Sequence, residues 1–308
     1  MKKEKQNYLE LIKKKNYSII GNHSAVKTCL WLKKSLYNDG SCYKSKFYGI
    51  ISHRCIQMTP SVICNQKCIF CWRPIELDLD TKNKIIWNEP EFIANQSFLS
   101  QKKLITGFGG SLKTNIEKYN ESKNPFSVAI SLIGERTLYP YLDELILNYK
   151  KKNIITFIVS NGTNPNMIEK IKPDYLYLSL DAPNEKLYNY ICAPNNKKLW
   201  KNINDSLNIL KLKKLSVKNT IIRITVLRNY NYNKAYEFSK LINVALPRFI
   251  EIKSYMHIGY SRYRIQRDNM LNINELISFS NIICKTTNNY KIINISEISR
   301  VVLLSIIN

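Results

Sequence analysis

Three cysteines, Cys64, Cys68 and Cys71, form a short CxxxCxxC loop that constrains this chain more than any other feature. Thiolates are the soft ligands that iron–sulfur clusters and zinc prefer. Three thiolates on one loop can hold three corners of a 4Fe–4S cubane, which leaves the fourth iron open to chelate a small molecule. A structural zinc site takes four closed ligands, commonly as two CxxC pairs, and this loop lacks that pattern. Zinc stays an alternative if His53 or Cys55 completes the set.

Short apolar runs alternate with stretches of helical spacing from about residue 55 onward. The strand candidates, rich in β-branched and aromatic residues, are 55–62, 127–133, 154–159, 175–180, 221–227 and 249–253. Helical spacing occurs in 91–104, 138–152, 165–172, 199–214, 234–244 and 273–287. Such alternation predicts an α/β fold whose parallel sheet has right-handed crossovers. Roughly six units are too few to close an eight-stranded barrel, so we expect a partial (β/α)6-type parallel barrel over 55–308, preceded by a cysteine-bearing N-terminal extension over 1–54.

The chain is strongly basic, with 47 Lys and Arg against 23 Asp and Glu and a formal net charge of +24. Nucleic acid is the direct inference for a partner. Lysine supplies 37 of the 47 cationic residues, however, and the codon bias of an AT-rich genome would produce the same composition without a nucleic-acid partner. No apolar run is long enough for a membrane span, and the N-terminus is too charged for a signal peptide, so we expect a cytoplasmic protein. There the eight cysteines are better read as metal ligands or buried thiols than as disulfides.

The cysteine loop and its surroundings resemble a known enzyme family. An aromatic residue, Phe70, precedes the last cysteine, as in the radical S-adenosylmethionine (SAM) superfamily. The longer stretch from Cys55 to Arg73 resembles the tRNA wybutosine-synthesising family of 4-demethylwyosine synthases, in its archaeal form without a flavodoxin domain. Further matches follow in order at 42–50, 131–140, 160–165, 176–194 and 249–262.

The resemblance implies a SAM-chelating 4Fe–4S cluster on Cys64, Cys68 and Cys71. It also implies SAM contacts in loops that follow the strand candidates, at Gly134, Glu135, Asn161, Ser179 and Asp181. From the residues alone, the Asn161 segment is also a good turn and the Asp181 segment a plausible helix entry. Arg136 departs from the family, which usually has proline there, and adds charge beside Glu135.

A second set of cysteines, Cys29, Cys42 and Cys55, is spaced by 13 residues each time. Spacing alone favours buried free thiols. The resemblance instead implies a second 4Fe–4S cluster, with one iron open for pyruvate. It further implies a lysine that forms a Schiff base with pyruvate, for which Lys44 matches and Lys46 is the alternative. Such an amine must be deprotonated, so its pKa must lie well below the usual ~10.4.

Two cysteines, Cys192 and Cys284, match no family position and are expected to be buried thiols. Aromatic residues at Trp72, Tyr255 and Tyr260 would suit stacking of a splayed RNA base, although each alone is more often core. The polar residues Lys253, His257 and Arg262, on and after the last strand candidate, are candidates for contacts to SAM, pyruvate or phosphate.

The activity implied by the resemblance is that of a radical SAM carbon–carbon lyase acting on tRNA. It would condense N1-methylguanosine-37 of tRNA-Phe with two carbons of pyruvate into the tricyclic wyosine base. The sequence shows no flavodoxin module, so we expect an external flavodoxin- or ferredoxin-type electron donor, and a monomer. Two alternatives stay open: another radical SAM RNA-modifying enzyme, such as a methyl- or methylthio-transferase, and a non-catalytic RNA-binding iron–sulfur protein. The first leaves the second cysteine set and Lys44 unexplained, and Arg136 is the only hint of the second.

Overall fold

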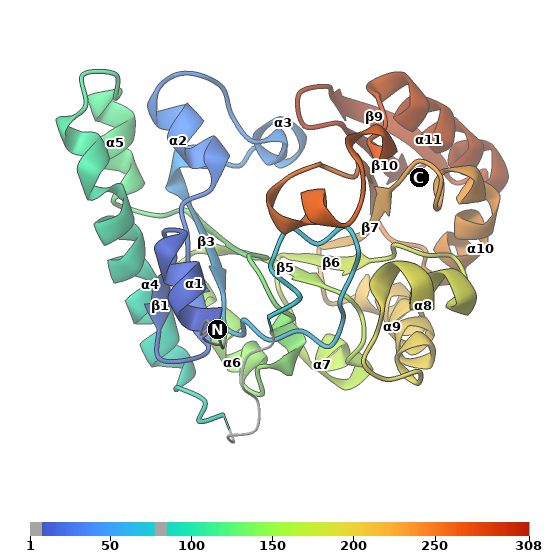
Figure 1. Ribbon diagram of the computed structural model, residues 1–308, viewed down its shortest axis with the longest axis horizontal. Coiled ribbons are helices and arrows are strands. Elements are labelled where there is room, and N and C mark those ends of the chain that lie inside the picture. The colour runs from blue at the N-terminus through green and yellow to red at the C-terminus, as the bar shows by residue number, and fades with distance from the viewer. Residues whose placement is uncertain (1–7, 78–84, 308) are drawn as a thin grey trace, which may run out of the picture. The chain divides into compact units, whose positions relative to one another are not determined.

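The chain divides into two compact units, shown in the computed structural model of Figure 1, which describes residues 8–77 and 85–307. Unit 1 comprises Met1–Ser45, Gly49–Cys64 and Ile75–Phe157, and unit 2 comprises Lys46–Tyr48, Asn65–Pro74 and Ile158–Asn308. Helix α3 (Tyr43–Tyr48) and strand β5 (Ile155–Ser160) contribute residues to both units. The boundary expected at residue 55 is a separate, sequence-based division and stays a prediction.

The described strands of unit 1 combine antiparallel and parallel pairs. Their order is β1 (Ser18–Ile20), β2 (Ser24–Val26), β3 (Cys55–Thr59) and β4 (Ser127–Ile130). The pairs β1–β2 and β2–β3 are antiparallel, whereas β3 and β4 are parallel with Cys55 opposite Ser127. All four residues of β4 are buried, as expected for a parallel strand covered on both faces.

The helices of unit 1 are short except for α4. They are α1 (Tyr8–Lys14), α2 (Leu30–Leu36), α4 (Pro90–Ile105), α5 (Ile116–Ser122) and α6 (Leu142–Lys151), with 3-10 turns η1 (Ser52–Arg54), η2 (Thr106–Gly110) and η3 (Arg136–Leu138). Helix α4 begins with a proline at its first position and buries Ile93, Ser97, Gln101 and Ile105 at a spacing of four. It packs with this side along β1, β2, β3 and α6, and so covers the strands of its unit (Figure 1).

The described strands of unit 2 begin as a parallel set and end as an antiparallel one. Their order is β6 (Tyr175–Ser179), β7 (Asn219–Val226), β8 (Phe249–Ser254), β10 (Val301–Ile306) and β9 (Tyr290–Ser296). Strands β6, β7 and β8 are parallel, with Ile221 opposite Phe249, as the alternating pattern predicts. Strands β9 and β10 were not predicted, and they extend β8 with antiparallel pairs.

The helices of unit 2, apart from α8, pack in the order of the chain. They are α7 (Pro165–Lys170), α8 (Glu185–Cys192), α9 (Leu199–Lys213), α10 (Ala235–Ala245) and α11 (Ile273–Thr287), with 3-10 turns η4 (Tyr232–Lys234), η5 (Gly259–Tyr263) and η6 (Arg267–Asn269). Contacts join α7 to α9, α9 to α10 and α10 to α11 (Figure 1). None of the helices in the described parts of the chain combines the length and the apolar character needed to cross a bilayer.

Loops at the carboxyl ends of the parallel strands carry the predicted site residues in each unit. In unit 1 the loop after β3 leads to Cys64, and the loop after β4 carries Gly134 and Glu135. In unit 2, Asp181 follows β6 and a long segment, 255–272, follows β8. Parallel strands place such loops at one edge of a sheet, where polar residues collect.

Candidate functional site

In unit 1 the three N-terminal cysteines share one buried neighbourhood. Cys29 caps the N-terminus of α2, where its Sγ accepts a hydrogen bond from the Leu32 amide at 3.3 Å. Cys42 precedes α3, and Cys55 is the first residue of β3. Burial, helped by the nearby Cys55 and Cys42 sulfurs, raises the pKa of the Cys29 thiol to about 12. The fold therefore gathers three thiols that lie 13 residues apart in the sequence.

The chemistry of this donor set fits a cluster better than a single ion. Within residues 8–77 and 85–307, no three His, Cys, Asp or Glu side chains converge on a point where one metal ion would sit. A zinc ion needs such convergence, whereas each thiolate of a cubane binds a different iron. His53, the alternative zinc ligand, has both ring nitrogens in other contacts, at 2.6 Å to Glu121 Oε2 and 3.0 Å to Ser35 Oγ.

Lys44 lies beside this thiol set and is almost withdrawn from solvent. Its side chain is 9% exposed, and its Nζ lies 4.3 Å from the centroid of the Phe157 ring. Burial raises the pKa of the Cys55 thiol, and the positive charge of Lys44 works in the opposite direction, so the two groups are close. Lys46 differs, because it is exposed and donates to the Ile295 carbonyl at 2.6 Å.

The loop after β4 packs directly onto the segment that precedes Cys64. Gly134 has φ +75°, and a Cβ there would lie 2.1 Å from the Ser61 carbonyl oxygen, so the position admits only glycine. Next to it, the Glu135 amide donates to the Ile63 carbonyl at 2.6 Å. The Glu135 side chain is buried and accepts hydrogen bonds from the amide and hydroxyl of Thr137, at 3.0 and 2.8 Å. Arg136 is buried as well.

Cys64 ends a segment of unit 1, whereas Cys68 and Cys71 lie in unit 2. Within unit 2 the cysteine segment is held by the end of α8. The Lys67 amide donates to the Cys192 carbonyl at 3.0 Å, and the Ile69 amide donates to the Ile191 carbonyl at 2.9 Å. A hydrogen bond with the Cys192 thiol and burial both raise the pKa of Cys68, and burial also raises the pKa of Cys71. Cys192 is thus buried, as expected, and also adjoins Cys68, whereas Cys284 is only partly buried.

Three of the predicted SAM contacts line one small hollow of unit 2, next to Cys192. Asn161, Ser179 and Asp181 lie there with Gln66, Tyr188 and Trp200. The Asn161 Nδ2 donates to Asn65 Oδ1 at 2.9 Å, which ties this strand end to the cysteine segment. Burial raises the pKa of Asp181 to about 6, although the carboxylate accepts the Thr225 amide at 2.8 Å.

A buried ion pair in unit 2 was not predicted. Arg223 on β7 lies opposite Glu251 on β8, and their closest N–O distance is 2.8 Å. The Glu251 carboxylate also accepts the hydroxyls of Tyr48 and Tyr177, at 2.8 and 2.9 Å. Arg223 is also the register partner of Ser179, so its charge lies next to the hollow of Asn161, Ser179 and Asp181. The sequence did contain a signal for this pair, because a positive and a negative residue each lie inside an otherwise apolar strand candidate.

The three aromatic stacking candidates differ in access. Tyr255 is 1% exposed and packs with Leu227 and Ile265, so its ring has no free face for a base. Tyr260 and Trp72 are partly exposed and adjoin each other, because the Tyr260 amide donates to the Trp72 carbonyl at 3.0 Å. Only this pair retains the exposure that stacking requires.

Two family models match consecutive parts of this chain from residue 58 to residue 305. Residues 58–242 match the radical SAM superfamily, and residues 244–305 match a model described as wyosine base formation. The chain is 45% identical to the tRNA 4-demethylwyosine synthase of Methanocaldococcus jannaschii, over 96% of this chain and 94% of that one. It is 42% identical to the Pyrococcus horikoshii protein of the same name, over 96% of this chain and 87% of that one.

A solved structure extends this likeness to three dimensions. The structure described as TYW1 with a lysine-pyruvate adduct bound superposes with a TM-score of 0.87 at 43% identity, over 96% of this chain and 94% of that one. The predicted α/β fold of the radical SAM kind is therefore confirmed. The antiparallel pairs at β1, β2, β9 and β10 are additions that the sequence did not reveal.

Proposed function

The chain belongs to the family of radical SAM tRNA 4-demethylwyosine synthases, and on this premise we propose that it condenses N1-methylguanosine-37 of tRNA-Phe with pyruvate. The observation that carries the proposal is the buried Lys44 beside the thiol set of Cys29, Cys42 and Cys55. A radical SAM methyl- or methylthio-transferase needs no buried amine beside such a thiol set, whereas capture of a keto acid as a Schiff base does. A solved relative described with a lysine-pyruvate adduct supports the same reading.

In this proposal Cys64, Cys68 and Cys71 hold the SAM cluster. A 4Fe–4S cluster held by these thiolates would supply the electron that cleaves SAM into methionine and a 5′-deoxyadenosyl radical. Asn161, Ser179 and Asp181 orient SAM from their shared hollow, and Gly134 and Glu135 take part from the loop after β4. The Asp181 carboxyl, with its pKa raised by burial, can donate as an acid or accept as a carboxylate near neutral pH.

Lys44 has the role of capturing pyruvate. Its unprotonated amine attacks the carbonyl carbon, water leaves, and the resulting imine fixes the keto acid next to the second cluster, on Cys29, Cys42 and Cys55. The deoxyadenosyl radical takes one hydrogen atom from the N1-methyl group, and the resulting carbon radical adds to the imine carbon of bound pyruvate. The bond to the carboxylate carbon then breaks, and that carbon leaves as a CO2 radical anion whose electron returns to the redox chain, giving CO2. The exocyclic amine of the guanine displaces Lys44 and closes the ring on the two remaining carbons, which makes the enzyme a carbon–carbon lyase. An external flavodoxin- or ferredoxin-type donor supplies the electron, and the monomer acts in a reducing, cytoplasm-like compartment.

One reconstitution experiment tests the proposal. Protein reconstituted anaerobically with iron and sulfide, and chemically reduced, is given SAM, carbon-13 pyruvate and tRNA-Phe bearing N1-methylguanosine. We expect 5′-deoxyadenosine, together with a tRNA nucleoside that carries two labelled carbons in its mass spectrum. SAM cleavage without label in the RNA would instead indicate another RNA-modifying activity. Absence of 5′-deoxyadenosine would indicate a non-catalytic RNA-binding protein.

A further inference from the structure

A hollow of about 380 Å³ opens in unit 2, within the segment that follows β8. Its lining residues are Met256, His257, Ile258, Arg262, Arg267 and Met270. Both arginines are exposed, and none of the lining residues is acidic. The remaining side chains are apolar apart from one imidazole, so the hollow pairs two guanidinium groups with an apolar floor.

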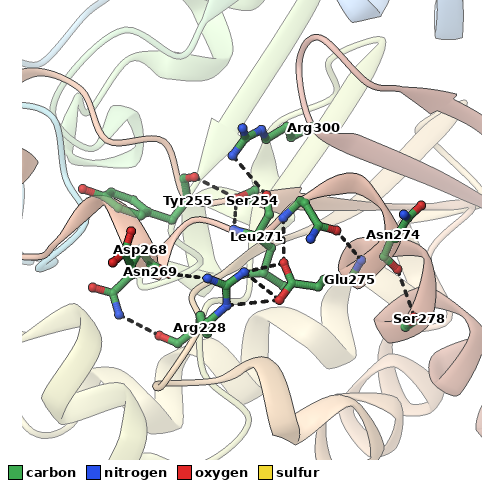
Figure 2. Close-up of polar contacts among 11 residues, drawn as sticks. Arg228, Ser254, Tyr255, Asp268, Asn269, Leu271, Asn274, Glu275, Ser278 and Arg300 are labelled. Atoms are coloured by element: carbon green, nitrogen blue, oxygen red, sulfur yellow. Dashed lines mark hydrogen bonds and ion pairs between the residues drawn. The ribbon is translucent and has the colours of Figure 1, made fainter.

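The part of this segment that carries Arg267 and Met270 is fixed by a hydrogen-bond network that Figure 2 shows. Arg228 donates to the Asp268 carbonyl at 2.7 Å and pairs with the Glu275 carboxylate at 2.5 Å. The side chain of Asn269 donates to the Arg228 carbonyl at 2.9 Å, and the Arg228 amide donates back to the Asn269 carbonyl at 3.0 Å.

The same segment is anchored at its far end. The Leu271 amide donates to Ser254 Oγ at 2.8 Å, and Arg300 donates to the Leu271 carbonyl at 3.2 Å (Figure 2). Arg228 forms its ion pair with Glu275. The two arginines of the hollow, Arg262 and Arg267, take no part in this pair. Arg262 is itself held in place, because its Nε donates to the Gly259 carbonyl at 3.1 Å. A preformed wall loses little order on binding, which favours affinity.

The hollow is also linked to the cysteine segment of the same unit. Gly259, with φ +57°, lies so close to the Trp72 carbonyl that a Cβ would be 2.4 Å from its oxygen. Arg264 donates to the Ile69 carbonyl at 3.0 Å and also to the Cys71 carbonyl. One short stretch, 255–270, therefore both lines the hollow and supports the backbone next to two proposed cluster ligands.

Its size and chemistry decide what the hollow would bind. A volume of about 380 Å³ exceeds what one phosphate group fills, and Met256, Ile258 and Met270 offer no hydrogen bonds to a second anion. Guanidinium groups bind phosphate in a bidentate manner, and apolar or aromatic side chains pack against a base. Of the lining residues, Ile258 is 51% exposed, and Tyr263, which follows Arg262 in the chain, is 78% exposed, which suits contact with an RNA strand.

We propose that this hollow binds one nucleotide of the substrate RNA, with its phosphate on Arg262 and Arg267 and its base or ribose on Met256, Ile258 and Met270. The inference rests on the proposed function for the identity of the RNA. It adds to that function a defined RNA-binding site on the segment that follows β8, which composition alone does not reveal.

Titration of binding against salt tests the site. The probe is a labelled anticodon stem-loop of tRNA-Phe that carries N1-methylguanosine, and the variants are Arg262→Ala, Arg267→Ala and the double variant. We expect each single variant to raise Kd about tenfold, as loss of a charge-assisted contact does. We also expect the slope of log K against log salt to fall by about 0.7 for each lost phosphate contact. Arg248→Ala is the matched control, an exposed arginine that precedes β8 instead of following it, and should change neither quantity.

A variant of the apolar rim gives an independent readout. Ile258→Ser removes an exposed side chain, so folding is preserved, and it should raise Kd without changing the salt slope. Thermal unfolding and iron content check that every variant is folded.

The inference is overturned if the double variant keeps the wild-type Kd and salt slope while wild-type protein still forms the tricyclic base. It is equally overturned if the double variant loses only the binding of inorganic phosphate, which would mean a small-anion site. If the arginine variants lose RNA binding but wild-type protein makes no tricyclic base, the RNA site stands and the proposed function fails.

Discussion

The Lys44 side chain lies over the Phe157 ring and near the Cys55 thiol, with almost no access to solvent. Burial penalises the ammonium ion, so keeping a charged amine in such a place costs free energy of folding. Lys46, two residues further along the same helix, is exposed and bound to a backbone carbonyl. The two lysines that sequence alone leaves open therefore have distinct environments, and of the two only Lys44 is withdrawn from solvent beside the thiol set.

Replacement of Lys44 tests this role. Borohydride added to wild-type protein with pyruvate should trap the imine and raise the protein mass by one reduced pyruvate unit. Lys44→Arg retains the charge but cannot form an imine, so it should show no mass increase and form no labelled base. Lys46→Ala should be trapped as wild type is. Trapping that persists in Lys44→Arg and disappears in Lys46→Ala would transfer the role to Lys46.

A matched pair of glycine substitutions tests the loop that carries Glu135. Gly134 and Gly49 both have positive φ, +75° and +69°, but only Gly134 has backbone oxygens where a Cβ would be placed. Gly49→Ala should cost about 1 kcal/mol, the ordinary penalty of the left-handed region. Gly134→Ala must also displace the Ser61 backbone, so we expect a loss well above that figure and a weaker affinity for SAM. Equal melting temperatures for the two variants would contradict the close packing.

Among the elements, those with a regular interior were predictable. Helix α11 coincides with its predicted range, 273–287, because a capping box of Asn272 and Glu275 starts it and a helical period continues it. The short elements before residue 55 were not predictable, because β1 and β2 have three residues each and depend on tertiary contacts. Strands β9 and β10 were missed because no sequence period distinguishes their antiparallel pairing.

The candidate site also has a part that the sequence predicts and a part that it does not. Asn161, Ser179 and Asp181 were predictable, because the ends of neighbouring parallel strands come together. The pairing of Arg223 with Glu251 was not, since it depends on the register of β7 with β8. The contact of Cys192 with Cys68 depends on how the end of α8 meets the cysteine segment, over a separation of more than a hundred residues along the chain. Contacts between residues so far apart in the chain cannot be predicted from the local sequence pattern.

His23 illustrates how one side chain joins elements of unit 1. Its Nδ1 donates to the Pro60 carbonyl at 2.8 Å, and its Nε2 accepts the Asn88 amide at 2.9 Å. The ring lies 4.8 Å from the Trp87 ring, centroid to centroid. These contacts require a neutral imidazole, and burial lowers its pKa from the usual range. The link thus fixes the chain between β3 and Cys64, and the entry to α4.

A stability profile against pH follows from this histidine. The folded state resists protonation of His23 that the unfolded chain accepts, so its stabilising contribution is complete above about pH 6.5 and declines as pH falls toward the lowered folded pKa. His23→Gln keeps a donor and an acceptor but does not titrate. We expect the variant to have the lower melting temperature at pH 7.5, with a gap that narrows below pH 6.5. A gap independent of pH would refute the neutral, buried state.

At the scale of the whole molecule, the proposed site residues are distributed over both compact units. Unit 1 holds Cys29, Cys42, Cys55 and Lys44, together with Cys64 and the loop of Gly134 and Glu135. Unit 2 holds the hollow of Asn161, Ser179 and Asp181 and the RNA site proposed after β8. The net charge of +24 adds a long-range attraction for RNA that is independent of sequence and sensitive to salt. In the proposed function, one set of side chains captures pyruvate and another supports radical formation. A mutation can therefore abolish one of these steps and leave the other intact.

Iron content measures this separation most directly. Two 4Fe–4S clusters predict about eight irons per reconstituted chain. Cys42→Ala should lower this to about four and abolish incorporation of pyruvate carbon, while SAM is still cleaved without RNA product. Cys68→Ala should also retain about four irons but cleave no SAM. Cys284→Ala, a thiol on α11 with no assigned ligand role, should keep all eight. If Cys42→Ala keeps the wild-type iron content, Cys42 is not a cluster ligand, and the assignment of a second cluster to Cys29, Cys42 and Cys55 fails.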